Sequence, residues 1–582
     1  MNLSSAGASV SYRFFVAVGV VLLLLLTLGL GLVFGFSSYA DIEHLRHARY
    51  HDSTFRYLVI PLEPAGYALA KNLLLALLGG LVGIVAWQLQ TKGTLYQELA
   101  ALRQEWRTGP SVLAPWHALT LAERRTGLLL LAVLFVVRGY YVLRFPLYGD
   151  ELVTYFSFVR EGAVAATSFY PIPNNHILYS AVCWVFSLLS TNFYWVMRGP
   201  AFLISMVGTM VVGLLLLRRW PFQVVALSMG LFAFFPYALF QAVVGRGYFL
   251  LAVCSQLAFL AGLALVYGSA RPRLAWASLV GASVVGFYTI PTFLLVFVGL
   301  GVGLAASMWR QPHQLVRLGM AGLLVALATL LLYTPVLLVS GPAALLGNAY
   351  VAPGAGHTAE LNALPYPALI DGQLTGLGSI GLPVVLAVSL AGYGATRSKY
   401  TNHFSLPLIK LLLGLLWLPY VVLAFRGVYP PARVLSFRMF FVFLLGALLL
   451  DALLSLPALQ RWRQQPALTV VLPVLLWAAV VLVPFQHRAT LEAGRNARVT
   501  QVYSWLRLQR AHAVLTTHTH YQLYLLFYSQ ADHWPLAIDA APQPESYYDF
   551  QLLDKEAGEV ADSALPVLFE NIDVRIHRVP GS

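Results

Sequence analysis

An adjacent pair of carboxylates, Asp150 and Glu151, follows directly after a long apolar stretch of the chain. Carboxylates are costly to place beside lipid, so such a pair at a membrane surface indicates a functional site or, alternatively, an acidic loop that faces water. Other reactive or ligand-binding side chains fall at the same ends of the apolar stretches: His176, Arg198, Arg246, His357, Arg426, Arg433 and Arg438. We therefore predict that any chemistry takes place at one face of a membrane.

The composition is that of a protein with many membrane spans. Of the 582 residues, 59% are hydrophobic and only 10% are charged, whereas soluble proteins average roughly 25% charged residues. Cys183 and Cys254 lie in apolar runs and form no disulfide or metal pattern. The formal net charge of +13 does not imply a nucleic-acid partner, because Lys and Arg collect in the cytoplasmic loops of membrane proteins. No cleavable signal peptide is expected.

Hydropathy and basic residues together predict a topology. About thirteen spans are expected, at residues 14–36, 66–88, 126–144, 199–217, 222–240, 247–268, 274–290, 291–309, 316–339, 376–394, 405–425, 437–455 and 466–485. The turns on one side then each carry a basic pair: Arg218 and Arg219, Arg271 and Arg273, Arg310 and Arg317, Arg397 and Lys399, Arg461 and Arg463. The positive-inside rule places this side in the cytoplasm. The N-terminus is then inside, and Asp150 and the C-terminus are outside.

Residues 176–190 are predicted to form a helix that lies along the membrane interface. His176, Ser180, Cys183, Ser187 and Ser190 recur at helical spacing, which gives a small polar face opposite an apolar one. The stretch is short for a span. The alternative is a short, tilted transmembrane helix, but it would put every basic pair on the outside.

Three regions are expected. Residues 1–125 form a two-span extension with a basic cytoplasmic segment, and residues 126–485 form a transmembrane core with outer loops at 145–198 and 340–375. The second of these loops is long enough to act as a lid. Residues 486–582 are predicted to form a small extracytoplasmic α/β domain, with a helix at 497–509, a strand at 512–516 and a helix at 519–529. His518 and His520 are interpreted as ordinary surface histidines.

Four stretches resemble the GT-C class of membrane glycosyltransferases, and in particular the bacterial relatives of protein O-mannosyltransferases and the lipid A aminoarabinose transferase. They are Tyr148-Gly-Asp-Glu151, Pro173-Asn-Asn-His-Ile-Leu-Tyr179, Gly245-Arg-Gly-Tyr248 and Ser436-Phe-Arg-Met-Phe440. In the second, Ile177 replaces the proline usual in the family. Residues 1–125 have no counterpart in the core pattern. The chain also lacks a segment like the carbohydrate-binding module of eukaryotic protein mannosyltransferases.

The resemblance implies an all-α polytopic fold and a set of site residues. Asp150 would be the base, and Glu151 would orient it, bind the acceptor or hold a divalent metal. The donor phosphate would be bound by Arg246, Arg438 and Arg426, and substrate by Asn174, Asn175, His176, Tyr248 and His357. Other interpretations stay open: a structural ion pair of either carboxylate with Arg144 or Arg198, arginines that anchor to lipid headgroups, and His176 as a helix cap.

The implied activity is transfer of a sugar from a polyprenyl-phosphate donor, with inversion, to a glycan, lipid or protein acceptor outside the cytoplasm. The expected location is a bacterial inner membrane, with the site facing the periplasm or exterior. One alternative is a polymerase or ligase for lipid-linked oligosaccharides. Another is a transporter or flippase, although the predicted spans contain almost no charge.

Overall fold

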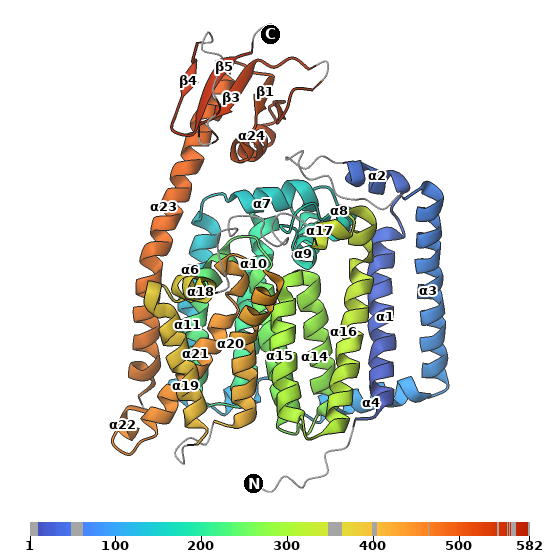
Figure 1. Cartoon of the computed structure of the whole chain (residues 1–582), viewed down its shortest axis with the longest axis vertical. Coiled ribbons are helices and arrows are strands. Elements are labelled where there is room, and N and C mark those ends of the chain that lie inside the picture. The colour runs from blue at the N-terminus through green and yellow to red at the C-terminus, as the bar shows by residue number, and fades with distance from the viewer. Residues whose placement is uncertain are drawn as a thin grey trace.

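Long apolar helices stand side by side and build most of the molecule (Figure 1). The computed structural model describes residues 10–47, 62–346, 364–397, 404–463, 465–543, 546–555, 557, 559 and 566–579. Within these residues, ten helices are long and apolar enough to cross a membrane: α1 (Tyr12–Phe34), α3 (Pro64–Gln90), α6 (Leu121–Arg144), α10 (Phe193–Leu216), α13 (Tyr248–Val266), η2 with α15 (Pro291–Met308), α16 (Pro312–Val339), η3 with α19 (Gly378–Ala395), α20 (Leu406–Arg426) and η5 with α23 (Ala467–Leu508).

The predicted number of thirteen spans is not confirmed. The bent pair α11 (Phe222–Ala233) and α12 (Pro236–Val243) raises the number of candidate spans among the described residues to eleven at most. Helices do form over the other two predicted spans, as α14 (Pro272–Thr289) and α21 (Arg438–Leu454). They do not satisfy the same requirements for length and apolarity, and α21 has only 17 residues.

The break between α11 and α12 bends the chain by 66°. Pro236 lacks an N–H donor and disfavours helical geometry at the residue before it, so the helix ends at Ala233. Arg138 of α6 is fully buried, and its guanidinium donates to the carbonyl oxygens of Ala233 (3.3 Å) and Ser205 (3.0 Å). A cation at the end of a helix satisfies the carbonyls that the break leaves free. The redirected chain then leads to Arg246.

Shorter helices cover the two ends of the bundle. In Figure 1, α2, α7, α8, α9 and α17 lie at the end that carries Asp150, and α4 and α22 at the opposite end. Their bounds and those of the remaining short helices are α2 (Tyr39–His47), α4 (Thr94–Arg107), α5 (Ala114–His117), α7 (Gly149–Thr154), η1 (Tyr155–Val159), α8 (Ala163–Ser168), α9 (Ile177–Ser187), α17 (Pro342–Leu346), α18 (Pro365–Thr375), η4 (Ala432–Leu435), α22 (Gln460–Arg463) and α24 (Thr519–Ala531).

Helix α9 confirms the helix predicted near residues 176–190. Its 11 residues reach about 17 Å, well short of a hydrocarbon core of about 30 Å. Ser180 and Cys183 are buried against the protein, whereas Val185 and Leu189 are exposed. The small polar face therefore packs inward and the apolar face points outward, which suits a helix that borders lipid.

A small α/β unit stands beyond the end of α23 (Figure 1). Its sheet has the order β2-β1-β3-β5-β4, with β1 parallel to β2 and β3, and β5 antiparallel to β3 and β4. The strands are β1 (Ala513–Thr516), β2 (Ala537–Asp539), β3 (Phe550–Asp554), β4 (Phe569–Glu570) and β5 (Val574–Arg578). The predicted strand at 512–516 and helix at 519–529 are confirmed as β1 and α24. The predicted helix at 497–509 is the end of α23, which crosses residue 486 without a break.

This unit shares a hydrophobic core with the end of the bundle that carries Asp150. Leu152 and Val153 of α7 pack in one cluster with Val502 of α23 and Tyr524 of α24. A larger cluster fills the bundle itself. The C-terminal unit is therefore joined by side-chain packing to the helix that begins at the carboxylate pair.

Candidate functional site

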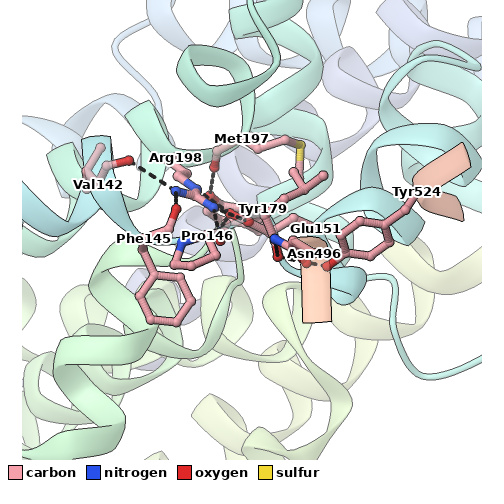
Figure 2. A network of polar contacts seen from close by, with 11 residues as sticks. Val142, Phe145, Pro146, Glu151, Tyr179, Met197, Arg198, Asn496 and Tyr524 are labelled. Atoms are coloured by element: carbon pink, nitrogen blue, oxygen red, sulfur yellow. Dashed lines mark hydrogen bonds and ion pairs between the residues drawn. The ribbon is translucent and has the colours of Figure 1, made fainter. Parts of the chain in front are cut away.

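Glu151 forms the centre of a buried network (Figure 2). Its carboxylate accepts two hydrogen bonds from Arg198, at 2.9 and 2.7 Å, and both side chains are fully buried. The backbone N–H of Gly245 donates to the same carboxylate at 2.8 Å. The other guanidinium donors of Arg198 bind carbonyl oxygens at the end of α6 and just after it: Val142, Phe145 and Pro146. Glu151 thus joins α7, α10 and the turn before Arg246, as the ion-pair interpretation expected.

Asp150 faces a different environment. Its side chain is 34% exposed, and one carboxylate oxygen lies 3.3 Å from Nη1 of Arg246, which is 5% exposed. Successive helical positions point about 100° apart, so the two adjacent carboxylates serve different surfaces. Both lie in the first turn of α7, where the helix dipole favours negative charge. The accessible carboxylate of the pair is therefore Asp150.

Arg246 is held by the other predicted motif. Nη1 donates to Oδ1 of Asn174, and Nη2 lies 3.4 Å from Nε2 of His176. Nδ1 of His176 accepts the backbone N–H of Gly247 at 2.8 Å, and its ring packs edge-on against Tyr248. The His176 side chain does not cap α9. The structure thus brings together Asp150, Asn174, His176, Arg246 and Tyr248.

His176 is neutral in this setting. Burial, followed by the nearby charges of Arg246 and Arg433, lowers the pKa of the imidazole well below its usual value. Because Nδ1 accepts a hydrogen bond, the single proton of the neutral ring is on Nε2. The Nε2–H donor and the Arg246 guanidinium are therefore adjacent, an arrangement that suits an anionic oxygen.

Two further arginines add to this cluster: Arg433, which the sequence named only among the residues at the outer ends, and Arg488, which it missed. Arg433 of η4 and Arg488 of α23, together with Arg246, oppose the rise in the pKa of Tyr148 that burial and Asp150 cause. The Arg488 guanidinium also lies 3.8 Å from the centre of the Phe240 ring. Neither Arg433 nor Arg488 has a carboxylate within 4 Å in the described part of the chain. We call Asp150, Asn174, His176, Arg246, Tyr248, Arg433 and Arg488 the Asp150 cluster; it holds three arginines and one accessible carboxylate.

Arg438 lies elsewhere. Nη1 of Arg438 is 2.8 Å from Oδ1 of Asp371, and each side chain is only 1% exposed. Nε donates to the Leu416 carbonyl, and the guanidinium lies over the Tyr420 ring. These contacts join α18, α20 and α21, and removing either charge would leave the other buried and unpaired. The contacts therefore do not support the prediction that Arg438 binds phosphate in the cluster.

The remaining predicted residues have separate outcomes. Asn175 is buried and bonds the carbonyls of Ala166 and Phe169, so it shapes the turn before α9. Arg426 is exposed at the end of α20, and no described contact joins it to the cluster. His357 lies outside the described residues. Substrate binding by His357 and donor-phosphate binding by Arg426 stay predictions.

The expectation for His520 is wrong. Its ring packs on Tyr524, with centroids 4.1 Å apart, and Nδ1 lies 3.9 Å from where a Cβ on Gly149 would stand. Burial, helped by His518 and Arg495, lowers the pKa of His520 to about 4. Its position between α24 and α7 depends on a fold that brings residues 149 and 520 together, which spacing in the sequence does not reveal.

The carboxylate pair does not fit a divalent metal. Glu151 is occupied by Arg198 and by the Gly245 N–H, and Asp150 faces Arg246. In the described ranges, no three His, Cys, Asp or Glu side chains lie together as a ligand set. A divalent metal at this pair stays a prediction from the sequence, and these contacts do not support it.

The apolar helices and the likeness to a solved structure show that this membrane protein has the GT-C fold that the sequence predicted. ArnT from Cupriavidus metallidurans, bound to undecaprenyl phosphate, is similar to this chain with a TM-score of 0.52 and 13% sequence identity, covering 77% of this chain and 97% of that chain. The apo form of the same protein gives a TM-score of 0.53 at 13% identity, with the same coverage. No protein-family model matches the chain, and neither does any curated protein.

Proposed function

We propose that the chain is an integral membrane glycosyltransferase that moves a sugar, with inversion, from a polyprenyl-phosphate carrier to an acceptor at the extracytoplasmic face. The observation that carries the proposal is the accessible carboxylate of Asp150 within a group of three arginines at the end of the bundle opposite the basic turns. The fold shared with ArnT, a protein seen with undecaprenyl phosphate bound, supports the choice of donor.

The proposed reaction uses the cluster as a base and an anion site. Asp150 takes the proton of the acceptor hydroxyl or amine as that atom bonds to the anomeric carbon from the side opposite the carrier. The bond from the anomeric carbon to the phosphate oxygen breaks, and the electron pair leaves with the lipid phosphate. Arg246, Arg433 and Arg488, with the Nε2–H of His176, stabilise the negative charge that develops there. Binding of the donor phosphate to Arg246 would release Asp150 from its ion pair.

Glu151 acts through other residues. Its contacts with Arg198 and the Gly245 N–H connect α7 to the turn that holds Arg246. Because these contacts occupy its carboxylate, we assign Glu151 as a positioning residue. This assignment matches the structural ion pair with Arg198 that the sequence left open as an alternative.

The transporter alternative requires ionisable groups along a path through the membrane. Arg138 is such a group, within α6. However, it is fully buried, and its donors bind carbonyl oxygens around the break between α11 and α12. These contacts support a structural role for Arg138, so the transferase is the function we propose.

The test is transfer by Asp150→Asn in membranes supplied with a radiolabelled polyprenyl-phosphate sugar. We expect activity to fall by at least a hundredfold, because base catalysis contributes roughly 10²–10⁴-fold. Glu161→Gln is the matched control, since Glu161 is a 42% exposed carboxylate outside the cluster. Undiminished transfer by Asp150→Asn overturns the assignment of the base, and movement of lipid without bond formation would favour a flippase.

A further inference from the structure

A groove runs between the outer part of α23 and the C-terminal sheet. Its volume is about 900 Å³, within the range of ligand sites. One wall is a face of α23, and the other includes Tyr528 of α24 and Phe569 of β4. Leu147, three residues before Asp150, also lines the groove. The groove is formed by different residues from those of the Asp150 cluster.

The groove is lined by uncharged side chains, some polar and some aromatic or aliphatic. Asn496, Thr500 and Ser504 recur every four residues and so share one face of α23, with Gln501 beside them. The aromatic rings of Tyr194, Trp505 and Tyr528 also line the groove. Every lining residue lies in the described part of the chain, and none of them carries a charge. In contrast, Asp150 lies 3.3 Å from the guanidinium of Arg246.

We infer that this groove binds an uncharged saccharide. The C–H faces of a sugar pack on aromatic rings, and its hydroxyl groups both donate and accept hydrogen bonds to amides and hydroxyls. Asn496 and Thr500 already donate to the carbonyls of Leu147 and Asn496, but an acyl or isoprenoid tail would cover Gln501 and Ser504 without offering them hydrogen bonds. An anionic headgroup or phosphate would need a cation, and none lines the groove. Sugar hydroxyls therefore match the polar side chains of α23, and the faces of sugar rings match the aromatic side chains.

The groove is joined to the loop that carries Asp150. Nδ2 of Asn496 donates to the Leu147 carbonyl at 3.0 Å, and the Tyr524 hydroxyl donates to the same oxygen at 2.7 Å. Figure 2 shows Asn496 and Tyr524 close to Glu151. A saccharide in the groove would therefore lie against this loop. We assign the bound saccharide to the acceptor, and this assignment rests on the proposed function. The groove would hold a part of the acceptor glycan next to the sugar unit that reacts.

The test is binding of the full-length protein, in detergent, to a glycan array that carries uncharged and anionic oligosaccharides. We expect uncharged glycans to bind. Ala497→Trp should weaken that binding at least tenfold, because Ala497 is exposed and lines the groove, so a large side chain fills it. Leu491→Trp adds the same group at a 57% exposed position of α23 outside the groove and should leave binding unchanged.

A second variant tests the hydrogen-bonding groups of the groove without adding side-chain volume. The double substitution Gln501→Ala and Ser504→Ala removes two exposed hydrogen-bonding groups without adding volume, and it should weaken glycan binding severalfold. No binding of any uncharged glycan, or equal binding by the wild type and Ala497→Trp, overturns the inference. So does binding to phosphatidylglycerol vesicles, in place of glycans, that Ala497→Trp abolishes.

Failure of this inference can be told apart from failure of the proposed function. Asp150→Asn should lose transfer but keep glycan binding, because Asp150 does not line the groove. If the wild-type protein transfers sugar but binds no uncharged glycan, only the inference about the groove is contradicted. If the protein binds glycans but never forms a glycosidic bond, only the proposed transferase function is contradicted.

Discussion

At the scale of single residues, neighbours in sequence serve different purposes. Glu151 is fully buried and ion-paired with Arg198, whereas Asp150 is one-third exposed beside Arg246. A buried ion pair is stable only while both partners remain, since removing one leaves an unpaired charge away from water. The same contrast separates Arg438, which is paired with Asp371, from the exposed Arg433.

Arg438→Gln should therefore reduce mainly the stability of the protein, and Arg433→Gln mainly its binding of the donor. Arg438→Gln should lower the free energy of unfolding by about 3–5 kcal/mol, because Asp371 stays buried without its partner. Arg433→Gln should change stability by less than about 0.5 kcal/mol, as expected for an exposed site. It should instead raise the KM for the donor about tenfold or more. Thermal melting and donor titration measure the two effects.

A double variant serves as the control for Arg438. Adding Asp371→Asn to Arg438→Gln should recover part of the lost stability, because the unpaired charge is then removed. Equal effects of Arg433→Gln and Arg438→Gln on the KM would contradict the division between a phosphate site and a structural pair.

At the scale of elements, the turn Val244–Gly247 links the broken helix to α13 and carries Arg246. The break at Ala233 and Pro236 redirects α12 toward the Asp150 end of the bundle. A Cβ on Gly245 would stand 2.6 Å from the carbonyl oxygen of Met197, which belongs to the backbone of α10. This close approach explains the glycine before Arg246, since any side chain would push the turn away from α10.

Gly245→Ala should therefore lower transfer sharply. The added methyl group meets backbone that cannot easily move. The displaced turn would shift Arg246 and break the hydrogen bond that the backbone N–H of residue 245 donates to Glu151. Overpacking of this kind costs about 1–3 kcal/mol of stability. Gly139→Ala in α6 is the control, because nothing lies within 4 Å of its added Cβ. Rates and melting temperatures would be measured on both, and normal transfer by Gly245→Ala would contradict the importance of this contact.

At the scale of the whole molecule, the C-terminal unit packs directly against the elements that carry the Asp150 cluster. Its helix α24 packs on α7, and Tyr524, fully buried, donates its hydroxyl proton to the Leu147 carbonyl. Arg488, near the middle of α23, reaches the Asp150 cluster although it lies more than 300 residues from Asp150 in the sequence. The C-terminal part of the chain thus supplies both packing and charge.

Tyr524→Phe tests this link with the loss of one oxygen atom. The kcat for transfer should fall severalfold while the KM for the donor stays constant, because the loop carrying Asp150 loses a hydrogen bond and the arginines do not. Stability should fall by about 1 kcal/mol. Tyr547→Phe is the control, since Tyr547 is 81% exposed in the same unit. A rise in donor KM with unchanged kcat would contradict a positioning role for Tyr524.

Much of the architecture could be predicted from local sequence, because each span must satisfy its own backbone inside the membrane. Apolar runs long enough to cross predict helices at their observed places, and helical spacing predicts α9. The span count is not confirmed where this signal weakens: Pro236 begins the second half of a bent span, and α21 is only 17 residues long. Length and apolarity alone do not decide such cases.

The sequence by itself determined which end of the bundle carries the reactive groups, and that Asp150, Asn174, His176 and Arg246 belong to it. Spans and their basic turns have a sidedness that can be read along the chain. Only the tertiary structure decided that Arg433 and Arg488 join Asp150 while Arg438 pairs with Asp371 and Glu151 with Arg198. The physical reason is that an arginine binds whichever partner packing brings within reach, and packing joins residues far apart in sequence.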